Sequence, residues 1–378
     1  MDAPQRSPGD RIVIALFAVL LLLPAAFALS GHAGFDTAFI ERTEDRFPFV
    51  APPPSTGALA TGGWQRDAER QIADGFPLRR QLIQSYDDAK YYGLGDIAST
   101  KVMRGRDEWL FLAADERGYI TGRERPSDAE LIVLADRYRA RAGWCARHGI
   151  AYVVVLAPNK STIYARFLPD GIQFQTPTPA DRLFALLWAR RVNAVDVRRP
   201  LVDASSRGEV YSKGDTHWND AGAYVAFRAI VAALRSAGVR DTIAPAALHP
   251  NSEAGPGDLL RLAGIADRVE NRIVRYAFPR RAREVNLPAY ADPAASALGG
   301  RATAADDASL PTAVVFGDSF VEQLQPFLSE VFRRAVFFHR ANEFAEQFSI
   351  PVAAAERPAV IIDELVERNL VFGARLNP

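Results

Sequence analysis

The stretch Ala313-Val-Val-Phe-Gly-Asp-Ser-Phe320 decides the fold, because a buried strand stops there on a small residue, an acid and a hydroxyl. Residues Ala313 to Phe316 form an apolar run of strand length with β-branched residues at its centre, which predicts a strand. After it, apolar residues recur at the spacing of a helix: Val321, Leu324, Phe327, Leu328 and Val331. Ser319 is therefore expected where a strand leads into a helix, at the carboxyl edge of a sheet.

This position suits a nucleophile. Backbone N–H groups are unpaired at the start of a helix, and the helix dipole favours developing negative charge there. Gly317 permits a turn that a side chain would obstruct. An ordinary turn with an N-cap is the alternative interpretation of Gly317-Asp-Ser319, and this stretch alone does not decide between the two.

The preceding chain supplies further strands and helices in alternation. Ser127 and Glu130 have the spacing of a capping box, and the helix that they open is expected to stop near Gly149. The nearly all-apolar strand Ile150 to Leu156 follows, which is typical of a sheet covered on both faces. Further elements are expected at 179–190 (helix), 192–197 (strand), 218 onward (helix), 335–338 and 359–363 (strands). This order predicts a doubly wound α/β sheet.

The domain organisation follows from where this alternation fails. Residues 99–378 are expected to form the α/β domain, which opens with two short strands joined by a turn over Lys101 to Leu112. Within it, residues 240–310 are rich in Ala, Pro, Gly and Arg and are expected to be an irregular insertion. Residues 31–98 are expected to be a linker and an N-terminal helical extension.

The N-terminus indicates the compartment. Ile12 to Leu29 is an unbroken apolar run of 18 residues, preceded by Arg6 and Arg11. At ~1.5 Å per residue such a helix spans ~27 Å, close to a hydrocarbon core of ~30 Å. We expect a signal anchor over residues 1–30 rather than a cleaved signal, although Ala26-Phe-Ala28 would suit a signal peptidase. Either way, the remainder of the chain is expected to be exported.

Composition excludes several classes of protein. The 378 residues are 48% hydrophobic, which is ordinary for a globular protein with a substantial core. Lysine plus arginine and aspartate plus glutamate both number 45, so nothing in the balance calls for nucleic acid as a partner. The single cysteine, Cys145, excludes an internal disulfide and a cysteine-based zinc site, and it is expected in the core.

A serine nucleophile needs a base, and among five histidines His217 stands out. It lies in Lys213-Gly-Asp-Thr-His-Trp-Asn219, a short loop that opens a helix, with Asp215 two residues earlier. An acid at that range can accept a proton from one ring nitrogen and leave the other facing a serine. A turn whose Asn219 caps the next helix is the alternative, and His339, which ends a strand beside the serine, is a minor candidate.

The two motifs are stronger together than apart. Each is expected at the end of a strand or loop that opens a helix, and such ends converge on one edge of an open α/β sheet. Asp215, His217 and Ser319 are then the parts of a triad, and their order in the chain carries no penalty. Asp215 and His217 could supply two metal ligands, but no second histidine lies near them in sequence, so neither a metal nor another cofactor is expected.

Gly317-Asp-Ser-Phe320 together with Asp215-Thr-His-Trp218 resembles the SGNH-hydrolase-like polysaccharide O-acetyltransferases of the alginate acetylation type. Three more stretches resemble further signatures of those proteins: Lys101 to Leu112, Pro158-Asn-Lys-Ser-Thr-Ile-Tyr164 and Asp74-Gly-Phe-Pro-Leu-Arg79. The chain order of acid, histidine and serine fits this acetyltransferase branch, whereas ordinary SGNH hydrolases place the serine first.

The resemblance runs from about residue 64 to the C-terminus. It implies an SGNH-like three-layer α/β/α domain with a mostly parallel sheet, preceded by the N-terminal membrane anchor helix. It makes Ser319 the nucleophile, His217 the base and Asp215 the residue that orients the base. For the oxyanion, we propose Asn159 beside the backbone N–H of Ser319.

The resemblance also implies partners and a location. Such proteins are typically held at or exported past the inner membrane of Gram-negative bacteria, accept acetyl groups from a membrane-bound O-acyltransferase and place them on an exopolysaccharide. We therefore expect a periplasmic O-acetyltransferase, anchored in the inner membrane, that acts on an exported polysaccharide such as alginate. A carbohydrate acetyl esterase with the same triad, and a non-catalytic polysaccharide-binding scaffold of an export complex, are the alternatives.

Three further stretches lie where substrate contacts could form: Gly257-Asp-Leu259, Arg340 and Glu367-Arg368. A structural salt bridge or a turn is the preferred interpretation of each.

Overall fold

The structure is a computed structural model of the chain, and it describes residues 8–27, 35–44, 46–76, 78–236, 239, 249–290, 300–339 and 348–372. The chain divides into two compact units. The first comprises residues 1–99 with 261–266, and the second comprises residues 100–260 with 267–378.

The regular structure in the described part of the first unit is helical. Its helices are α1 (Pro8–Phe27), α2 (Thr37–Glu44), α3 (Thr56–Ala60), α4 (Gly63–Asp74) and α5 (Arg79–Asp88), with a π-helical turn at Ala89–Gly93. Helix α1 lies inside the segment expected to be a signal anchor. Of the helices in the described ranges, none combines the length and apolar character that a membrane crossing requires. The anchor therefore stays a prediction.

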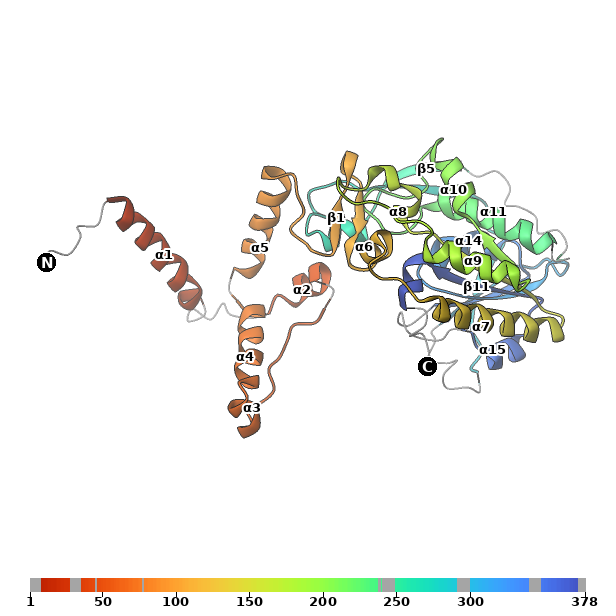
Figure 1. Ribbon diagram of the computed structural model, residues 1–378, viewed down its shortest axis with the longest axis horizontal. Coiled ribbons are helices and arrows are strands. Elements are labelled where there is room, and N and C mark those ends of the chain that lie inside the picture. The colour runs from red at the N-terminus through yellow and green to blue at the C-terminus, as the bar shows by residue number, and fades with distance from the viewer. Residues whose placement is uncertain are drawn as a thin grey trace. The chain divides into compact units, whose positions relative to one another are not determined.

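The second unit is built on a sheet of seven strands (Figure 1). Their order is β4 (Ala194–Asp196), β3 (Ala151–Ala157), β11 (Val360–Val366), β9 (Thr312–Gly317), β10 (Arg334–His339), β8 (Gly300–Ala304) and β7 (Arg283–Val285). The strands from β4 to β10 pair in parallel, whereas β8 and β7 are antiparallel additions at one edge. The predicted mostly parallel sheet is confirmed.

Helices cover both faces of this sheet, because its central strands are apolar on both sides. In β3, Val153 and Val155 belong to one hydrophobic core, and Val154 and Leu156 belong to the other. The first core is closed by α10 (Arg198–Ser205), α11 (Asp220–Ser236) and α14 (Val321–Ser329). The second is closed by α7 (Asp128–Arg147), α9 (Pro179–Ala189) and α15 (Ile350–Glu356), and Figure 1 shows α7 and α9 side by side. This is the three-layer α/β/α arrangement that was expected.

Several local predictions hold in detail. Helix α7 begins after Ser127, whose side chain forms a capping box with Glu130. The predicted turn joins two short strands, β1 (Val102–Arg104) and β2 (Leu110–Leu112), which pair with each other. Cys145 is fully buried in the core between α7 and the sheet, and burial raises the pKa of its thiol to about 12.

The region 240–310 is more regular than its composition indicates. Its described residues form a hairpin of β5 (His249–Ala254) and β6 (Arg272–Ala277), the short helix α12 (Asp258–Leu262), and the two antiparallel strands of the main sheet. Strands β7 and β8 are short and carry charged or small residues, so their sequences give little signal of their own. Strand β8 forms by pairing with β10, and β7 forms by pairing with β8, which is a case of tertiary context overriding local preference.

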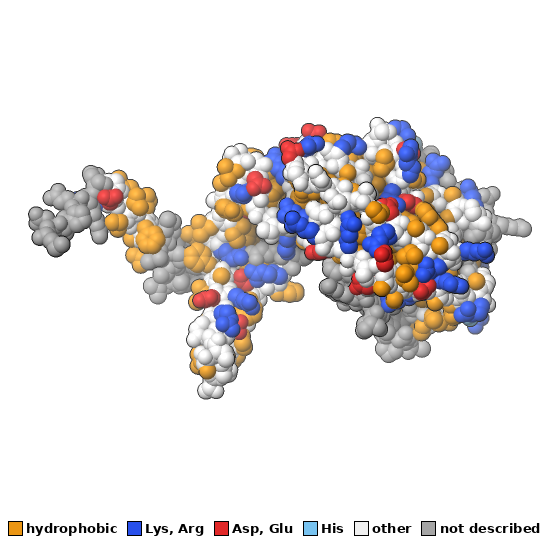
Figure 2. All heavy atoms as spheres, viewed as in Figure 1, with side chains coloured by type: hydrophobic (Ala, Val, Ile, Leu, Met, Phe, Trp, Pro, Cys, Tyr) orange, Lys and Arg blue, Asp and Glu red, His pale blue; other side chains and the backbone are white. Residues whose placement is uncertain are grey.

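Positive and negative side chains are interspersed on the face shown in Figure 2. This distribution matches the equal numbers of basic and acidic residues in the sequence.

Candidate active site

The turn after β9 is fixed by two buried acids. The carboxylate of Asp318 accepts hydrogen bonds from the backbone N–H groups of Phe320 (3.1 Å) and Val366 (2.8 Å). The N–H of Asp318 itself donates to Oε2 of Glu364 at 2.9 Å. A Cβ at Gly317 would lie 2.8 Å from that same oxygen, so the position requires glycine for close approach. These contacts hold Ser319 at the carboxyl edge of the sheet, with its hydroxyl free for another partner.

The loop that carries the histidine is closed at its base. Tyr211 and Trp218 pair as an isolated antiparallel bridge, and the indole N–H of Trp218 donates to the carbonyl of Phe320 at 3.0 Å. The side chain of Asn219 accepts the N–H of Gly222 at 3.1 Å, so it caps α11 as the alternative interpretation of this loop expects. The cap does not exclude a catalytic role, because it leaves the His217 ring uncommitted.

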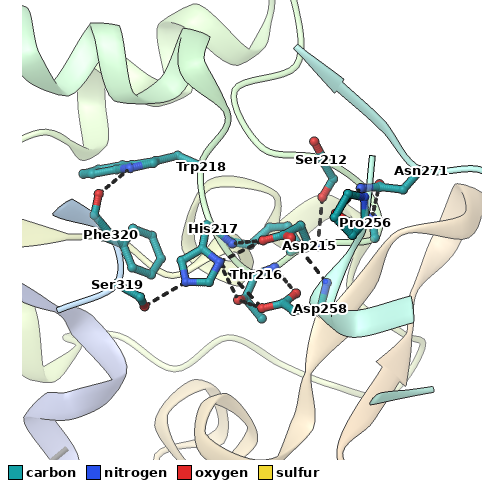
Figure 3. Close-up of polar contacts among 12 residues, drawn as sticks. Ser212, Asp215, Thr216, His217, Trp218, Pro256, Asp258, Asn271, Ser319 and Phe320 are labelled. Carbon is teal, nitrogen blue, oxygen red and sulfur yellow. Dashed lines mark hydrogen bonds and ion pairs between the residues drawn. The ribbon is translucent and has the colours of Figure 1, made fainter. Parts of the chain in front are cut away.

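The structure brings the three predicted triad residues together (Figure 3). Nε2 of His217 lies 2.8 Å from Oγ of Ser319, although the two residues are 102 positions apart. On the other side of the ring, Nδ1 of His217 lies 2.9 Å from Oδ1 of Asp215, which also accepts the backbone N–H of His217 at 2.9 Å. The geometry fits a proton on Nδ1, held by the carboxylate, with Nε2 free to accept the serine proton.

The surroundings of His217 favour its protonated form. Burial disfavours the imidazolium, but the hydrogen bond and charge of Asp215, joined by the charge of Asp258, outweigh burial and raise the pKa of His217 above its ordinary value. Burial also acts against the charge of Asp215, yet its hydrogen bond to His217 lowers the pKa of that carboxyl. The pair therefore stabilises a proton gained by the imidazole.

The side chain of Lys160 binds the backbone of the histidine loop. Its ammonium group is buried and donates to three backbone carbonyls, those of Ser212 (3.2 Å), Lys213 (3.0 Å) and Asp215 (2.7 Å). Burial lowers the pKa of Lys160 to about 8, against the opposing charges of nearby acids. In the sequence, Lys160 is identified only as part of the Pro158–Tyr164 stretch, without a role.

Asp258 is a second acid beside the imidazole that the sequence did not assign. It opens α12, and its Oδ2 lies 3.6 Å from Nδ1 of His217. In the sequence, Asp258 directly follows a glycine, as the acids at 215 and 318 do. This repeated Gly-Asp pair is the local feature by which Asp258 could have been found. A Cβ at Gly257 would collide with the carbonyl of Gly214, so this glycine allows the two loops to touch backbone to backbone.

Asp215, His217 and Asp258 lie close enough together to raise the question of a metal ion. All four carboxylate oxygens, however, already accept hydrogen bonds. Oδ1 and Oδ2 of Asp215 accept from His217 and from the N–H of Asp258, and both oxygens of Asp258 accept from Thr216. We therefore assign this cluster to holding the imidazole.

Asn159, the residue expected at the oxyanion, follows β3 at the same edge of the sheet. Its Oδ1 accepts the backbone N–H of Arg368 at 3.2 Å, whereas its Nδ2 is buried and meets no acceptor within the described ranges. The backbone N–H of Ser319 likewise forms no hydrogen bond to any residue whose position is described. Two donors thus remain available at this edge.

Hydroxyl groups in the rest of the Pro158–Tyr164 stretch donate hydrogen bonds to buried acids near this edge. Ser161 donates to Glu116 at 2.6 Å, and Thr162 donates to Glu367 at 2.5 Å. Burial raises the pKa of both acids, to about 7 for Glu367. Arg368 lies 3.8 Å from Glu116, so the structure supports the salt-bridge interpretation of this residue.

Other candidates play no part in the described site. His249 is exposed on β5, and Nδ1 of His148 contacts the carbonyl of Trp144 at 2.8 Å after the end of α7. The side chain of His339, all of Arg340 and all of His32 lie outside the described residues.

A protein family described as SGNH hydrolase-like domain, acetyltransferase AlgX, matches residues 102–365, which is well over half of the chain. The chain belongs to this family. The resemblance inferred from the two motifs is thereby confirmed, and the match begins at β1 and ends within β11.

Sequence relatives of this SGNH hydrolase-like chain carry the name probable alginate O-acetylase AlgJ. The protein from Pseudomonas syringae pv. tomato is 24% identical over 224 residues, covering 59% of this chain and 52% of its own length. The one from Pseudomonas putida is 27% identical over 198 residues, covering 47% and 49%. The chain thus spans about half the length of the curated relatives that it matches.

The fold has a structural counterpart in Bacillus cereus PatB1. The two superpose with a TM-score of 0.53 at 14% identity, over 71% of this chain and 96% of that one. At this identity the likeness supports the SGNH-like fold alone.

Proposed function

We propose that the chain is an O-acetyltransferase that moves acetyl groups through a serine acyl-enzyme onto hydroxyls of an exported polysaccharide. The observation that carries the proposal is the line of contacts from Asp215 through His217 to Ser319, at 2.9 and 2.8 Å. Membership of an acetyltransferase family gives the group transferred, and the AlgJ relatives give the class of acceptor.

The first half-reaction loads the serine. Nε2 of His217 takes the proton of Ser319 as Oγ attacks the carbonyl carbon of an acetyl ester. The tetrahedral intermediate collapses when the ester C–O bond breaks, and the leaving alcohol takes the proton from His217. Acetyl-Ser319 remains, and the imidazole is neutral again.

The second half-reaction unloads the serine onto sugar. A polysaccharide hydroxyl gives its proton to Nε2 of His217 as its oxygen attacks the acetyl-serine carbonyl. The serine C–O bond then breaks, and Ser319 recovers the proton from the imidazolium. The product is an O-acetyl sugar, and the enzyme returns to its starting state.

Both intermediates carry an oxyanion, for which we propose the N–H of Ser319 and Nδ2 of Asn159 as donors. A buried donor without an acceptor costs about 1–3 kcal/mol, so an unpartnered amide at this edge calls for a functional reason. Each such donor is worth roughly 10²–10³ in rate when it meets developing charge.

The donor, the location and the polymer are also part of the proposal. A membrane-bound O-acyltransferase would present the acetyl group, the reaction would take place in the periplasm, and alginate is the first polymer to test. The names of the AlgJ relatives support this choice of polymer.

The proposal is tested by giving the purified full chain an activated acetyl ester with and without an alginate-type oligosaccharide. We expect ester-linked acetyl groups on the sugar, detected by mass spectrometry, and none with Ser319→Ala. Ser206→Ala, on the surface directly after α10, serves as the control. Release of acetate alone would indicate an acetyl esterase instead, and no turnover of the ester by the native chain would favour a non-catalytic scaffold.

A further inference from the structure

Asp258 lies against the histidine loop, on the side of the His217 ring away from Ser319 (Figure 3). Its side chain is 21% exposed, similar to His217 and Asp215. Helix α12 is joined to the loop through Gly214, whose carbonyl accepts the N–H groups of Leu259 (3.1 Å) and Leu260 (3.3 Å). The main chain of α12 therefore docks on the loop without help from the carboxylate of Asp258.

The carboxylate points away from its own helix. An acid at the start of a helix ordinarily accepts N–H groups of the first turn. Here Oδ1 accepts the backbone N–H of Thr216 at 2.8 Å, and Oδ2 accepts the hydroxyl of the same residue. Thr216 stands between the two triad residues of this loop, so Asp258 fixes the segment that sets their mutual orientation.

Three oxygen atoms therefore surround Nδ1 of His217. Asp215 contributes the nearest at 2.9 Å, the hydroxyl of Thr216 follows at 3.3 Å, and Oδ2 of Asp258 lies at 3.6 Å. The Thr216 hydroxyl gives its proton to Asp258, so its lone pair is turned toward the ring. Asp258 also braces the first acid, because its N–H donates to Oδ2 of Asp215 at 3.3 Å.

We propose that Asp258 is a positioning residue, a second carboxylate that keeps the proton of His217 on Nδ1 and stabilises the imidazolium formed during acyl transfer. The inference rests on the proposed function, since it takes His217 to be the base. The groups that face this ring are Asp215 from its own loop, Asp258 from α12, Ser319 after β9, and Arg368, whose positive charge opposes the two acids from the end of β11.

The charge of Asp258 can be removed with little change in the shape of its side chain. Asp258→Asn keeps an oxygen that can accept the N–H of Thr216 and leaves the main chain of α12 in place, but it removes the negative charge. A charge 3.6 Å from the ring and partly screened by solvent is worth about tenfold in rate. We expect Asp258→Asn to slow acetylation of Ser319 by an activated ester by that amount and to lower the pKa of His217, though less than Asp215→Asn does.

The pKa is measured on the full chain by NMR titration of the histidine ring signals, with His217→Gln to assign the resonance. Asp203→Asn, at an exposed position of α10, is the matched control and should leave both the pKa of His217 and the acylation rate unchanged. If Asp258→Asn does not stay folded, Asp258→Ser, which keeps an oxygen at the start of α12, is titrated with the same expectation.

An unchanged pKa and an unchanged acylation rate would overturn the inference and leave Asp258 a structural contact. The titration does not require transfer to a sugar. Failure of the native chain to acetylate a polysaccharide would therefore contradict the proposed function while the role of Asp258 is still decided by the pKa.

Discussion

Asp215 and Asp318 occupy comparable positions at the same edge of the sheet, each directly after a glycine and close to a triad residue, yet they do different work. Both carboxylate oxygens of Asp318 accept backbone N–H groups, from Phe320 and Val366. Asp215 instead directs one oxygen to the imidazole of His217. The donors that a carboxylate meets, rather than the local motif, decide whether it shapes the backbone or holds an imidazole ring.

The two loops are also supported differently. The serine turn is held by Asp318 and Glu364, which belong to that turn and to the adjacent strand β11. The histidine loop is held by residues distant in sequence, Lys160 after β3 and Asp258 in α12. Ser319 is thus fixed by the sheet itself, and His217 is fixed by contacts that must assemble around it.

The largest effect is expected from the reacting pair. Replacing His217 by Gln should reduce acetylation of Ser319 by about 10³-fold or more, because the hydroxyl loses the group that takes its proton. The rate is measured with an activated ester by stopped-flow or mass spectrometry. Gln in place of His148, which lies outside the site, is the control and should retain the native rate.

The two aspartates provide the sharpest comparison. Asp215→Asn should lower the acylation rate by roughly 10²–10⁴-fold with little loss of stability, since the amide no longer holds the correct tautomer. Asp318→Asn should instead reduce stability and leave the acylation rate close to that of the native chain. It places an amide donor against a backbone N–H and should cost about 1–3 kcal/mol of unfolding free energy in denaturant titrations.

Equal losses of rate in both variants, with equal losses of stability, would contradict the division of labour between the two acids.

The sequence predicts the serine turn better than it predicts the support of the histidine loop. The strand ending at Gly317, the helix after it and the meeting of Asp215, His217 and Ser319 could be predicted, because apolar periodicity and the motifs are local signals. Asp258 could not be assigned from its sequence, since its contact with the loop depends on α12 docking through Gly214. Strands β7 and β8 were missed for the same reason, because β8 becomes a strand by pairing with β10 and β7 by pairing with β8, and their composition gives no such signal.

The support of the histidine loop is tested through Lys160. Lys160→Met removes a charged donor from three backbone carbonyls, of which that of Asp215 has no other donor among the described residues, and should cost about 2–4 kcal/mol of unfolding free energy. It should also slow acylation, because the carbonyl of Asp215 is one of the three. Lys90→Met, which removes a surface ion pair with Asp96, should change neither property. A Lys160→Met chain with native stability would contradict the support assigned to this lysine.

The smallest effect concerns Glu367, whose pKa is raised by burial from 4.5 to about 7. The folded chain then holds this proton more tightly than the unfolded chain, so its contribution to stability is full below about pH 4.5 and is lost as the pH rises to about 7. That rise in the pKa of Glu367 corresponds to at most about 3 kcal/mol.

Glu367→Gln cannot lose that proton, so its unfolding free energy should decline less than that of the native chain between pH 4.5 and pH 7. Parallel curves for the two proteins in chemical denaturation would show that Glu367 does not titrate in this range.

The central claim is that Ser319 is the nucleophile and that His217 activates it across the 2.8 Å contact. The most direct measurement is peptide mass spectrometry of the full chain after brief exposure to an activated acetyl ester, comparing the native protein with His217→Gln. The account predicts a single acetyl group on the peptide at Ser319 in the native chain and none at that position in the variant. Equal labelling of Ser319 in both proteins, or labelling spread over surface residues with Ser319 untouched, would contradict it.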